Sequence, residues 1–265
     1  MKKVFCKMAL AAVLALTTLL TGCKAPSSGG GGGNSGGESA YNPPEKNIPL
    51  TLEAIADGQI TFDNLDSITN LKYKLNDGEL TAATDSGISV SQKDIVTFFG
   101  EGTNNTWISK FIINCSSDCY VYGNVMSLLT EDYQTATEIT QDRAFDCLFY
   151  DNSHIKNHPS KNIVLPATTL AKDCYYDMFR GCSSLTQAPV LPATTLAEDC
   201  YVCMFYHCTS LNKVECLATD FSAEDCTTSW LSGVASSGTF IKASGMNDWP
   251  IGTDGIPFGW TVQNK

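Results

Sequence analysis

An internal repeat in the second half of the chain constrains the fold more than any other feature. The sequence Leu-Pro-Ala-Thr-Thr-Leu-Ala occupies residues 165–171 and returns 26 residues later, at residues 191–197. The sequence Asp-Cys-Tyr, which begins at Asp173, returns at the same spacing from Asp199. A fixed period with fixed apolar positions means that each unit supplies the same side chains to one stacked core.

Two weaker copies flank these two units. The later copy begins at Leu217 and has Trp230 where the preceding unit has Met204. The earlier copy ends in Leu148-Phe149, and the distance from it to the next unit is longer by four residues. The chain therefore has two well-preserved repeats and two degenerate ones.

Within one unit the apolar residues gather on one side of a short segment. Residues 178–185 have them at i, i+1, i+4 and i+7, which predicts a short helix or turn. The residues that follow are expected to be extended, because Pro189 excludes further helix. One short strand and one helical or irregular segment in 26 residues is typical of leucine-rich repeats, whose period is about 20–29 residues.

The motif Met-Phe-x-x-Cys-x-Ser-Leu at residues 178–185, followed by a short strand and Leu-Pro, resembles the BspA-type leucine-rich repeats of bacterial surface proteins. The tail at residues 255–262 is similar to the C-terminal cap of many such proteins, and the resemblance covers roughly residues 144–262. It implies a curved solenoid, exposure at the cell surface and a role in adhesion or protein binding. It supplies no catalytic residues, and this chain departs from the longest members of the family in having very few repeats.

The first half of the chain has a pattern of short strands and tight turns. Residues 71–75 alternate apolar and polar side chains, and Asn76-Asp77-Gly78 then predicts a hairpin, because Asp-Gly supplies the positive φ values of a tight turn. Six to eight strands at this spacing predict a small β-sandwich-like domain. The strands carry no catalytic constellation.

The N-terminus has the features of an export signal. Lys2 and Lys3 precede a run that is apolar from Met8 to Leu20 apart from two threonines, which is too short to span a bilayer comfortably. Leu-Thr-Gly-Cys, ending in Cys23, resembles the bacterial lipobox, in which the cysteine thiol is diacylated and the signal then removed. The alternative is an ordinary signal peptide with an accidental cysteine. Acyl chains contribute about 0.8 kcal/mol per buried methylene, so two or three of them hold a protein stably on a membrane.

The expected fold class is mixed β and α/β, with an N-terminal β-sandwich-like domain followed by a short leucine-rich-repeat solenoid and a C-terminal cap. Residues 27–39 are rich in Gly and Ser and predict a flexible tether behind the lipidated cysteine. The predicted divisions are a signal peptide at 1–22, the lipidated Cys and tether at 23–45, the β domain at 46–125, the repeats at 126–231 and the cap at 232–265.

Charge and composition exclude several classes of function. Residues 1–22 contain three of the 17 basic residues and none of the 28 acidic ones, which leaves 14 basic and 28 acidic residues in the remainder. A surface this acidic repels nucleic acid, so no nucleic-acid partner is expected. No nucleophile–base pair or phosphate-binding loop is present, and neither an enzyme nor a cofactor is expected.

Three patterns that resemble metal or catalytic sites are predicted to be structural. Cys200-x-x-Cys203 follows the repeat spacing rather than a zinc motif, and His154 and His158 lie in a loop rich in Asn, Ser and Pro. Three aspartates recur at one repeat position, which indicates capping or turn chemistry rather than paired general acids. They are Asp173, Asp199 and Asp225. No metal site is predicted.

The cysteines allow two interpretations. Those that follow the repeat are either small buried apolar residues or disulfide partners in adjacent units, and the first interpretation is favoured. They are Cys174, Cys182, Cys200, Cys203, Cys208, Cys216 and Cys226. Cys115 and Cys119 bracket a three-residue loop in a predicted hairpin, and in an exported protein they are the best disulfide candidates.

The function expected is that of a surface-exposed lipoprotein, held in the cell envelope at the outer membrane, that binds host or neighbouring-cell surface proteins through its repeats. The candidate ligand-binding residues are Thr186, Gln187, Asn212, Lys213 and Glu215. Two alternatives remain: a structural envelope component that presents the N-terminal domain, and a carbohydrate-binding protein that uses Trp107 and Tyr120. The membrane, through the lipid anchor, is the one further partner expected.

Overall fold

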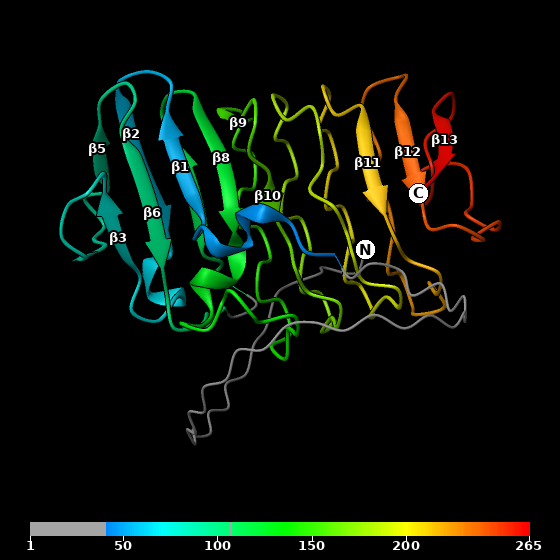
Figure 1. Cartoon of the computed structure of the whole chain (residues 1–265), viewed down its shortest axis with the longest axis horizontal. Coiled ribbons are helices and arrows are strands. Elements are labelled where there is room, and N and C mark those ends of the chain that lie inside the picture. Colours follow the sequence, from blue (N-terminus) through cyan, green and yellow to red (C-terminus); the bar gives the residue numbers. More distant parts are fainter. Residues whose placement is uncertain (1–40, 106–107) are drawn as a thin grey trace, which may run out of the picture.

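The computed structural model of the chain describes residues 41–105 and 108–265, and its strands follow one another along the long axis of the molecule (Figure 1). Helical structure in these ranges is confined to three 3₁₀ segments, η1 (Pro44–Asn47), η2 (Leu65–Ser67) and η3 (Val125–Leu128). The β-rich class predicted from the sequence is confirmed. The α/β component is wrong for the described residues, because the apolar segments of the repeats form turns and not α-helices.

One large sheet begins in the first half of the chain and continues into the second. Its strands, in spatial order, are β10 (Ile163–Val164), β8 (Cys119–Asn124), β1 (Thr51–Ala54), β6 (Ile95–Phe99), β3 (Lys72–Leu75) and β4 (Thr81–Ala82), and β9 (Ile155–Asn157) also pairs with β8. Strands β1, β3, β4, β6 and β8 pair antiparallel, whereas β9 and β10 both run parallel to β8. The pairing therefore changes from antiparallel to parallel at β8, and the sheet crosses the predicted domain boundary at residue 125.

A smaller sheet covers one face of the antiparallel strands. It consists of β5 (Ile88–Val90), β2 (Gly58–Asp63) and β7 (Ile112–Cys115). Phe62 of β2 packs edge-on against Phe98 of β6, with ring centroids 6.1 Å apart, and stacks on Phe111 at 6.0 Å. These buried rings join the two sheets into one core. The hairpin predicted at Asn76-Asp77-Gly78 is confirmed, since it links the antiparallel pair β3 and β4.

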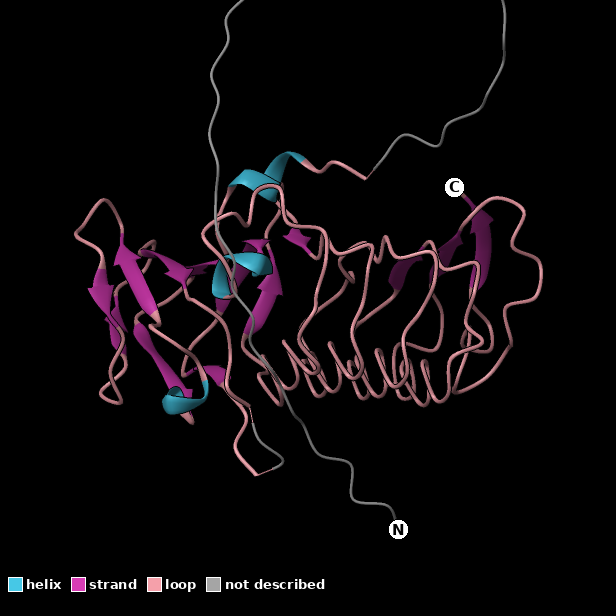
Figure 2. Cartoon of the chain, turned by 90° about the horizontal axis from the view of Figure 1, so that it is seen from below, coloured by secondary structure: helices cyan, strands magenta, loops and turns pink. Residues whose placement is uncertain are grey.

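Four segments of similar conformation follow in the second half, at residues 143–152, 173–182, 199–208 and 225–234; we call them the turn segments. Figure 2 shows them as a row of tight turns along one side of the molecule. Their first, fifth and ninth residues have positive φ, for example Asp173 (54°), Asp177 (51°) and Gly181 (74°). A left-handed residue at every fourth position breaks the α-helix that the apolar spacing allows. The recurring aspartates therefore have a turn role, because Asp tolerates this conformation.

Backbone hydrogen bonds in the turn segments alternate between two kinds of acceptor. The N–H of Tyr176 donates to the carbonyl of Asp173 within the same segment, at 3.1 Å. The N–H of Tyr175 instead donates to the carbonyl of Cys200, one segment further along the chain, also at 3.1 Å. The same alternation continues into the next segment, where Tyr201 donates to Cys226 at 3.0 Å. Every second amide of a segment therefore depends on the following segment for its acceptor.

Buried aromatic side chains stack in rows that run through the turn segments to Trp249 in the loop before β13. One row contains Phe145, Tyr175, Tyr201, Trp230 and Trp249, with neighbouring ring centroids 5.6 to 6.0 Å apart. A second row contains Phe149, Phe179 and Phe205. Apolar burial of this kind is the main favourable contribution to folding, so the rows hold the segments in register.

The cysteines of the repeats are free thiols, and all of them except Cys203 are buried. All ten cysteines in the described part of the chain are free. The Cys182 thiol donates to the carbonyl of Phe149 at 3.0 Å, and the Cys208 thiol donates to that of Phe179 at 2.9 Å. Each thiol therefore satisfies a carbonyl of the preceding unit, which gives these small residues a packing role. Burial raises the pKa of Cys208 to about 12.

The C-terminal residues complete the stack. Strands β11 (Lys213–Cys216), β12 (Thr239–Lys242) and β13 (Thr261–Asn264) form a parallel sheet. The last turn segment finds its acceptors in the loop before β13: the Ser229 N–H donates to Asp254 Oδ1 at 2.7 Å, and the Trp230 indole N–H donates to the carbonyl of Gly255 at 2.9 Å. This loop therefore takes the place of a further unit.

Candidate functional site

The five predicted ligand-binding residues lie together on two adjacent units. Gln187 forms a parallel bridge with Lys213, and the Asn212 N–H donates to the carbonyl of Thr186 at 3.0 Å. Thr186, Asn212 and Lys213 are exposed, while Gln187 and Glu215 are half-buried. The parallel pairing of the units thus brings residues 26 positions apart onto one polar face.

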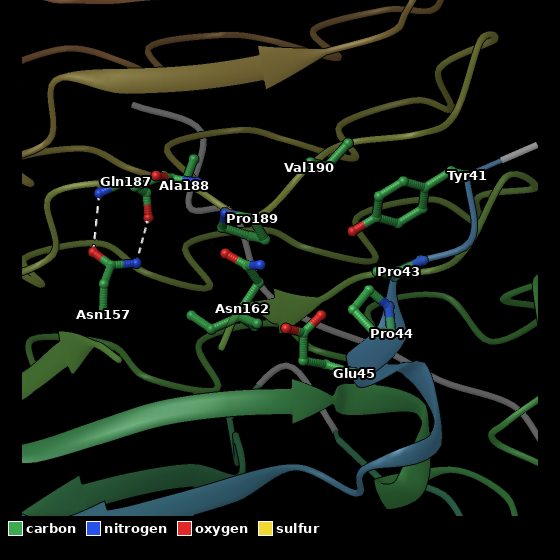
Figure 3. Close-up of a pocket in the computed structure, with 11 residues that line it drawn as sticks. Tyr41, Pro43, Pro44, Glu45, Asn157, Asn162, Gln187, Ala188, Pro189 and Val190 are labelled. Atoms are coloured by element: carbon green, nitrogen blue, oxygen red, sulfur yellow. Dashed lines mark hydrogen bonds between the residues drawn. The ribbon is translucent and has the colours of Figure 1, made fainter. Parts of the chain in front are cut away.

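Asn157 at the end of β9 extends this face, and the sequence analysis did not identify it. Its Oδ1 accepts hydrogen bonds from the N–H groups of Thr186 and Gln187, at 2.9 and 3.0 Å, and from the Thr186 hydroxyl at 3.0 Å. Its Nδ2 donates to the carbonyl of Gln187 at 2.9 Å (Figure 3). The side-chain amide of Asn157 therefore takes the hydrogen-bonding role of a neighbouring strand and fixes the backbone of Thr186 and Gln187.

Glu215 is already engaged by a cation. Its Oε1 lies 2.5 Å from the Nζ of Lys265, in an ion pair between a half-buried carboxylate and an exposed ammonium that joins β11 to the end of β13. Surface pairs of this kind contribute about 0–1 kcal/mol, so the pair orients the two side chains more than it stabilises the fold. Lys213 carries the accessible positive charge of the polar face.

A groove with a volume of ≈ 670 Å³ is lined by residues of several successive units. Successive units contribute equivalent residues to it: Pro166 and Pro192 lie 26 residues apart, as do Thr168 and Thr194. Lys265 lines the groove as well, so the Glu215–Lys265 pair connects the groove to the polar face. We call this hollow the repeat groove.

A second, smaller hollow with a volume of ≈ 130 Å³ lies where η1 crosses the strands, and we call it the η1 pocket. Tyr41, Glu45, Asn162 and Pro189 are among the residues that line it (Figure 3). Tyr41 also lines the repeat groove and separates the two hollows. Burial, together with the nearby carboxylates of Glu215 and Glu45, raises the pKa of the Tyr41 phenol, which keeps it protonated at neutral pH.

Cys115 and Cys119 lie at the two ends of the turn between β7 and β8, and the hairpin predicted there is wrong, because the two strands belong to different sheets. Both are buried free thiols, and each is a hydrogen-bond partner of the other. Their hydrogen bond lowers the pKa of Cys115, and the same bond, together with burial, raises the pKa of Cys119. The disulfide that the sequence favours stays a prediction, with the two sulfur atoms already adjacent.

Aromatic residues on β8 form a separate surface cluster. His158 packs against Tyr120 and Tyr122 with ring centroids 5.2 and 5.1 Å away, and the Lys161 ammonium lies 4.0 Å from the Tyr122 ring centroid. Burial lowers the pKa of His158. Tyr120 is half-buried in this cluster, and Trp107, the other residue considered for carbohydrate binding, lies outside the described residues.

The remaining candidates have structural positions. His154 Nδ1 lies 3.1 Å from Asp118 Oδ1. Cys203 has positive φ in a turn segment, and Cys200 is buried in the core beside it. In residues 41–105 and 108–265 no group of three His, Cys, Asp or Glu side chains is placed to hold a metal ion.

Comparison with known proteins returned no relatives: no family model matches the sequence, nor does any curated protein or solved structure. Among the described residues no helix has the length and apolar character needed to cross a bilayer. Cys23, the predicted lipid attachment site, lies outside the described residues, as do the predicted signal peptide and most of the tether.

Proposed function

We propose that this chain is a lipid-anchored protein of the bacterial cell surface that binds other surface proteins through stacked repeat units. In this proposal residues 46–125 form a β-sandwich-like domain, residues 126–231 form a short solenoid of BspA-type leucine-rich repeats, and residues 232–265 cap it. Hydrogen bonds and stacked rings between equivalent residues of successive units support the solenoid. Two sheets that pack through Phe62 and Phe98 support the sandwich.

The observation that carries the binding role is the pairing of a groove with a polar face on the same units. The repeat groove is lined by equivalent prolines and threonines of neighbouring units, and the ion pair of Lys265 with Glu215 links it to the polar face. Exposed polar side chains on a rigid parallel framework are how repeat proteins present a binding surface.

The surface location rests on the N-terminal sequence. The lipobox-like Leu-Thr-Gly-Cys and the Gly/Ser tether behind it support a lipid anchor that holds the folded part clear of the membrane. The test is to express the full chain and a Cys23→Ala variant in a bacterial host and to compare their partition into Triton X-114. We expect the wild type in the detergent phase and the variant in the aqueous phase; equal partition would contradict the anchor.

The binding role is tested by presenting the full chain, solubilised in detergent, to a panel of purified matrix and cell-surface proteins. Lys213→Glu reverses the accessible charge of the polar face, and Lys74→Glu makes the same change on exposed β3 at the other end of the molecule. We expect Lys213→Glu to lower the affinity for a bound panel protein at least tenfold and Lys74→Glu to leave it within twofold. Absence of binding to every panel member would favour the structural envelope role.

A further inference from the structure

The η1 pocket contains a buried carboxyl group with one oxygen that lacks a hydrogen-bond partner. Glu45 is 6 % exposed, and its Oε2 atom has no hydrogen-bond partner among the described residues. The ion pairs of the described residues do not include Glu45 either. A buried carboxylate is costly unless it is paired and hydrogen-bonded, so this side chain points to a donor that comes from outside the chain.

Two further polar groups point into the same space. Figure 3 shows the Tyr41 hydroxyl and the Asn162 side chain directed toward the hollow that Glu45 lines. Glu45 lies close enough to Tyr41 to raise the pKa of its phenol, in addition to the larger effect of burial. The pocket therefore offers one carboxylate and two neutral groups that can accept hydrogen bonds.

Proline and aliphatic residues form two sides of the pocket. Pro43 and Pro44 close it on the side of η1, and Ala188, Pro189 and Val190 close it on the side of the repeat. With a volume of ≈ 130 Å³ it is smaller than the about 300–1,000 Å³ of pockets that enclose whole small-molecule ligands. The pocket is suited to one side-chain end with a short apolar stem rather than to a whole sugar ring.

Charge then decides the chemical class of the ligand. The pocket has a carboxylate at its end, and the chain carries a net charge of −11, so an anion is excluded. A metal ion is disfavoured because only one carboxylate lines the pocket, and no three-ligand group exists in the part of the chain that the structure describes. A primary ammonium satisfies the carboxylate, the hydroxyl and the amide oxygen with its three donors.

We propose that the η1 pocket binds the lysine side chain of a partner protein, with the ammonium on Glu45, Tyr41 and Asn162 and the methylene stem against the prolines. The inference rests on the proposed function, since it names the side chain by which a surface protein is held. It places a specific contact next to the repeat groove, because Tyr41 belongs to both hollows.

The probe is the peptide Gly-Gly-Lys-Gly-Gly-amide with fluorescein coupled to its N-terminal amine, which leaves the lysine ammonium free. It is titrated with the full chain in detergent and followed by fluorescence anisotropy. A norleucine peptide keeps the stem and removes the charge, and Glu45→Gln keeps the shape of the pocket. Both changes are expected to weaken binding at least tenfold. Tyr41→Phe, expected to weaken it about threefold, serves as a second variant should Glu45→Gln not fold. Glu79→Gln, at an exposed position on the β3–β4 turn, removes the same charge and should leave binding within twofold.

Equal binding of the lysine and norleucine peptides, or a Glu45→Gln variant that binds like the wild type, would overturn the assignment of the pocket. The panel of surface proteins separates this failure from that of the proposed function. Panel proteins bound equally by the wild type and Glu45→Gln would leave the binding role standing without the pocket. Lysine-peptide binding that Glu45→Gln abolishes, with no panel protein bound, would support the pocket and contradict the proposed partners.

Discussion

The rings of Phe179 and Phe205 stack with their centroids 5.5 Å apart and their planes 2° apart. The two residues are 26 positions apart in the sequence and both are fully buried. The N–H of Phe179 also donates to the carbonyl of Met204, next to Phe205, at 2.9 Å. Side-chain stacking and backbone pairing therefore impose the same register on the two units.

Phe205→Ala should destabilise the protein strongly. The substitution removes a ring from the middle of a buried row and leaves a cavity, which costs about 3–5 kcal/mol in comparable cores. Urea denaturation followed by tryptophan fluorescence measures the change in the free energy of unfolding. Phe258→Ala is the matched control, because Phe258 is 76 % exposed, and its effect should stay within about 0.5 kcal/mol. Equal effects of the two substitutions would contradict the buried row.

Gly123→Ala should also destabilise the fold. Gly123 has a φ of 88°, and a Cβ there would lie 2.1 Å from the backbone oxygen of Pro49, at the strand where parallel pairing begins. Gly245 has a similar φ of 83° with open space around it. Gly245→Ala should therefore show only the conformational cost of about 1–2 kcal/mol. The melting temperature of Gly123→Ala should lie clearly below that of Gly245→Ala. Equal melting temperatures would exclude the clash.

Asp177 should make stability fall as the pH rises. Burial raises the pKa of this carboxyl to about 6, against the partial opposition of Arg180 at 3.3 Å. Because the pKa of Asp177 in the native state lies above its ordinary value of 3.8, the native state binds more protons than the unfolded state between about pH 4 and 6. The stabilisation is present at the acidic end of this window and is lost toward pH 6. It amounts to at most about 3 kcal/mol, since one unit of pKa corresponds to about 1.4 kcal/mol.

Asp177→Asn tests this pH dependence, because Asn tolerates the φ of 51° and cannot ionise. The free energy of unfolding of the variant should vary less between pH 4 and 6 than that of the wild type. Asp85→Asn removes an exposed carboxyl and should leave the wild-type slope unchanged. If the stability of the Asp177→Asn variant changed with pH as steeply as that of the wild type, another group would be responsible for the pH dependence.

Cys115 and Cys119 should form a disulfide when the protein is exported. Their thiols are hydrogen-bond partners, and closing so short a loop stabilises by about 2 kcal/mol in the chain-entropy account. Peptide mapping of unreduced protein from the periplasm should recover the two cysteines linked, and unfolding with an alkylating agent should label the repeat cysteines. Labelling of both Cys115 and Cys119 without reductant would contradict the bond.

The repeat register could be predicted from the sequence because identical side chains recur at a fixed spacing. The conformation of the turn segments could not, since Cys147 and Cys203 have positive φ although cysteine carries no preference for it. Asn157 was missed for a related reason: its role depends on backbone groups 30 residues away, which only the pairing of units brings near. The parallel addition of β9 and β10 to β8 likewise joins residues that the predicted boundary had separated.

The loop that receives the amide of Ser229 and the indole of Trp230 has a consequence for how this protein can change over time. The hydrogen-bond acceptors for the last turn segment come from a loop that is not itself a repeat unit. For every earlier turn segment they come from the turn segment that follows it. Duplication or deletion of a 26-residue unit in the interior would leave both ends of the stack intact. The units on either side of the change could still pair, with no backbone N–H group left without an acceptor. The number of units in the middle of the molecule can therefore change, whereas the final loop must always follow the last unit.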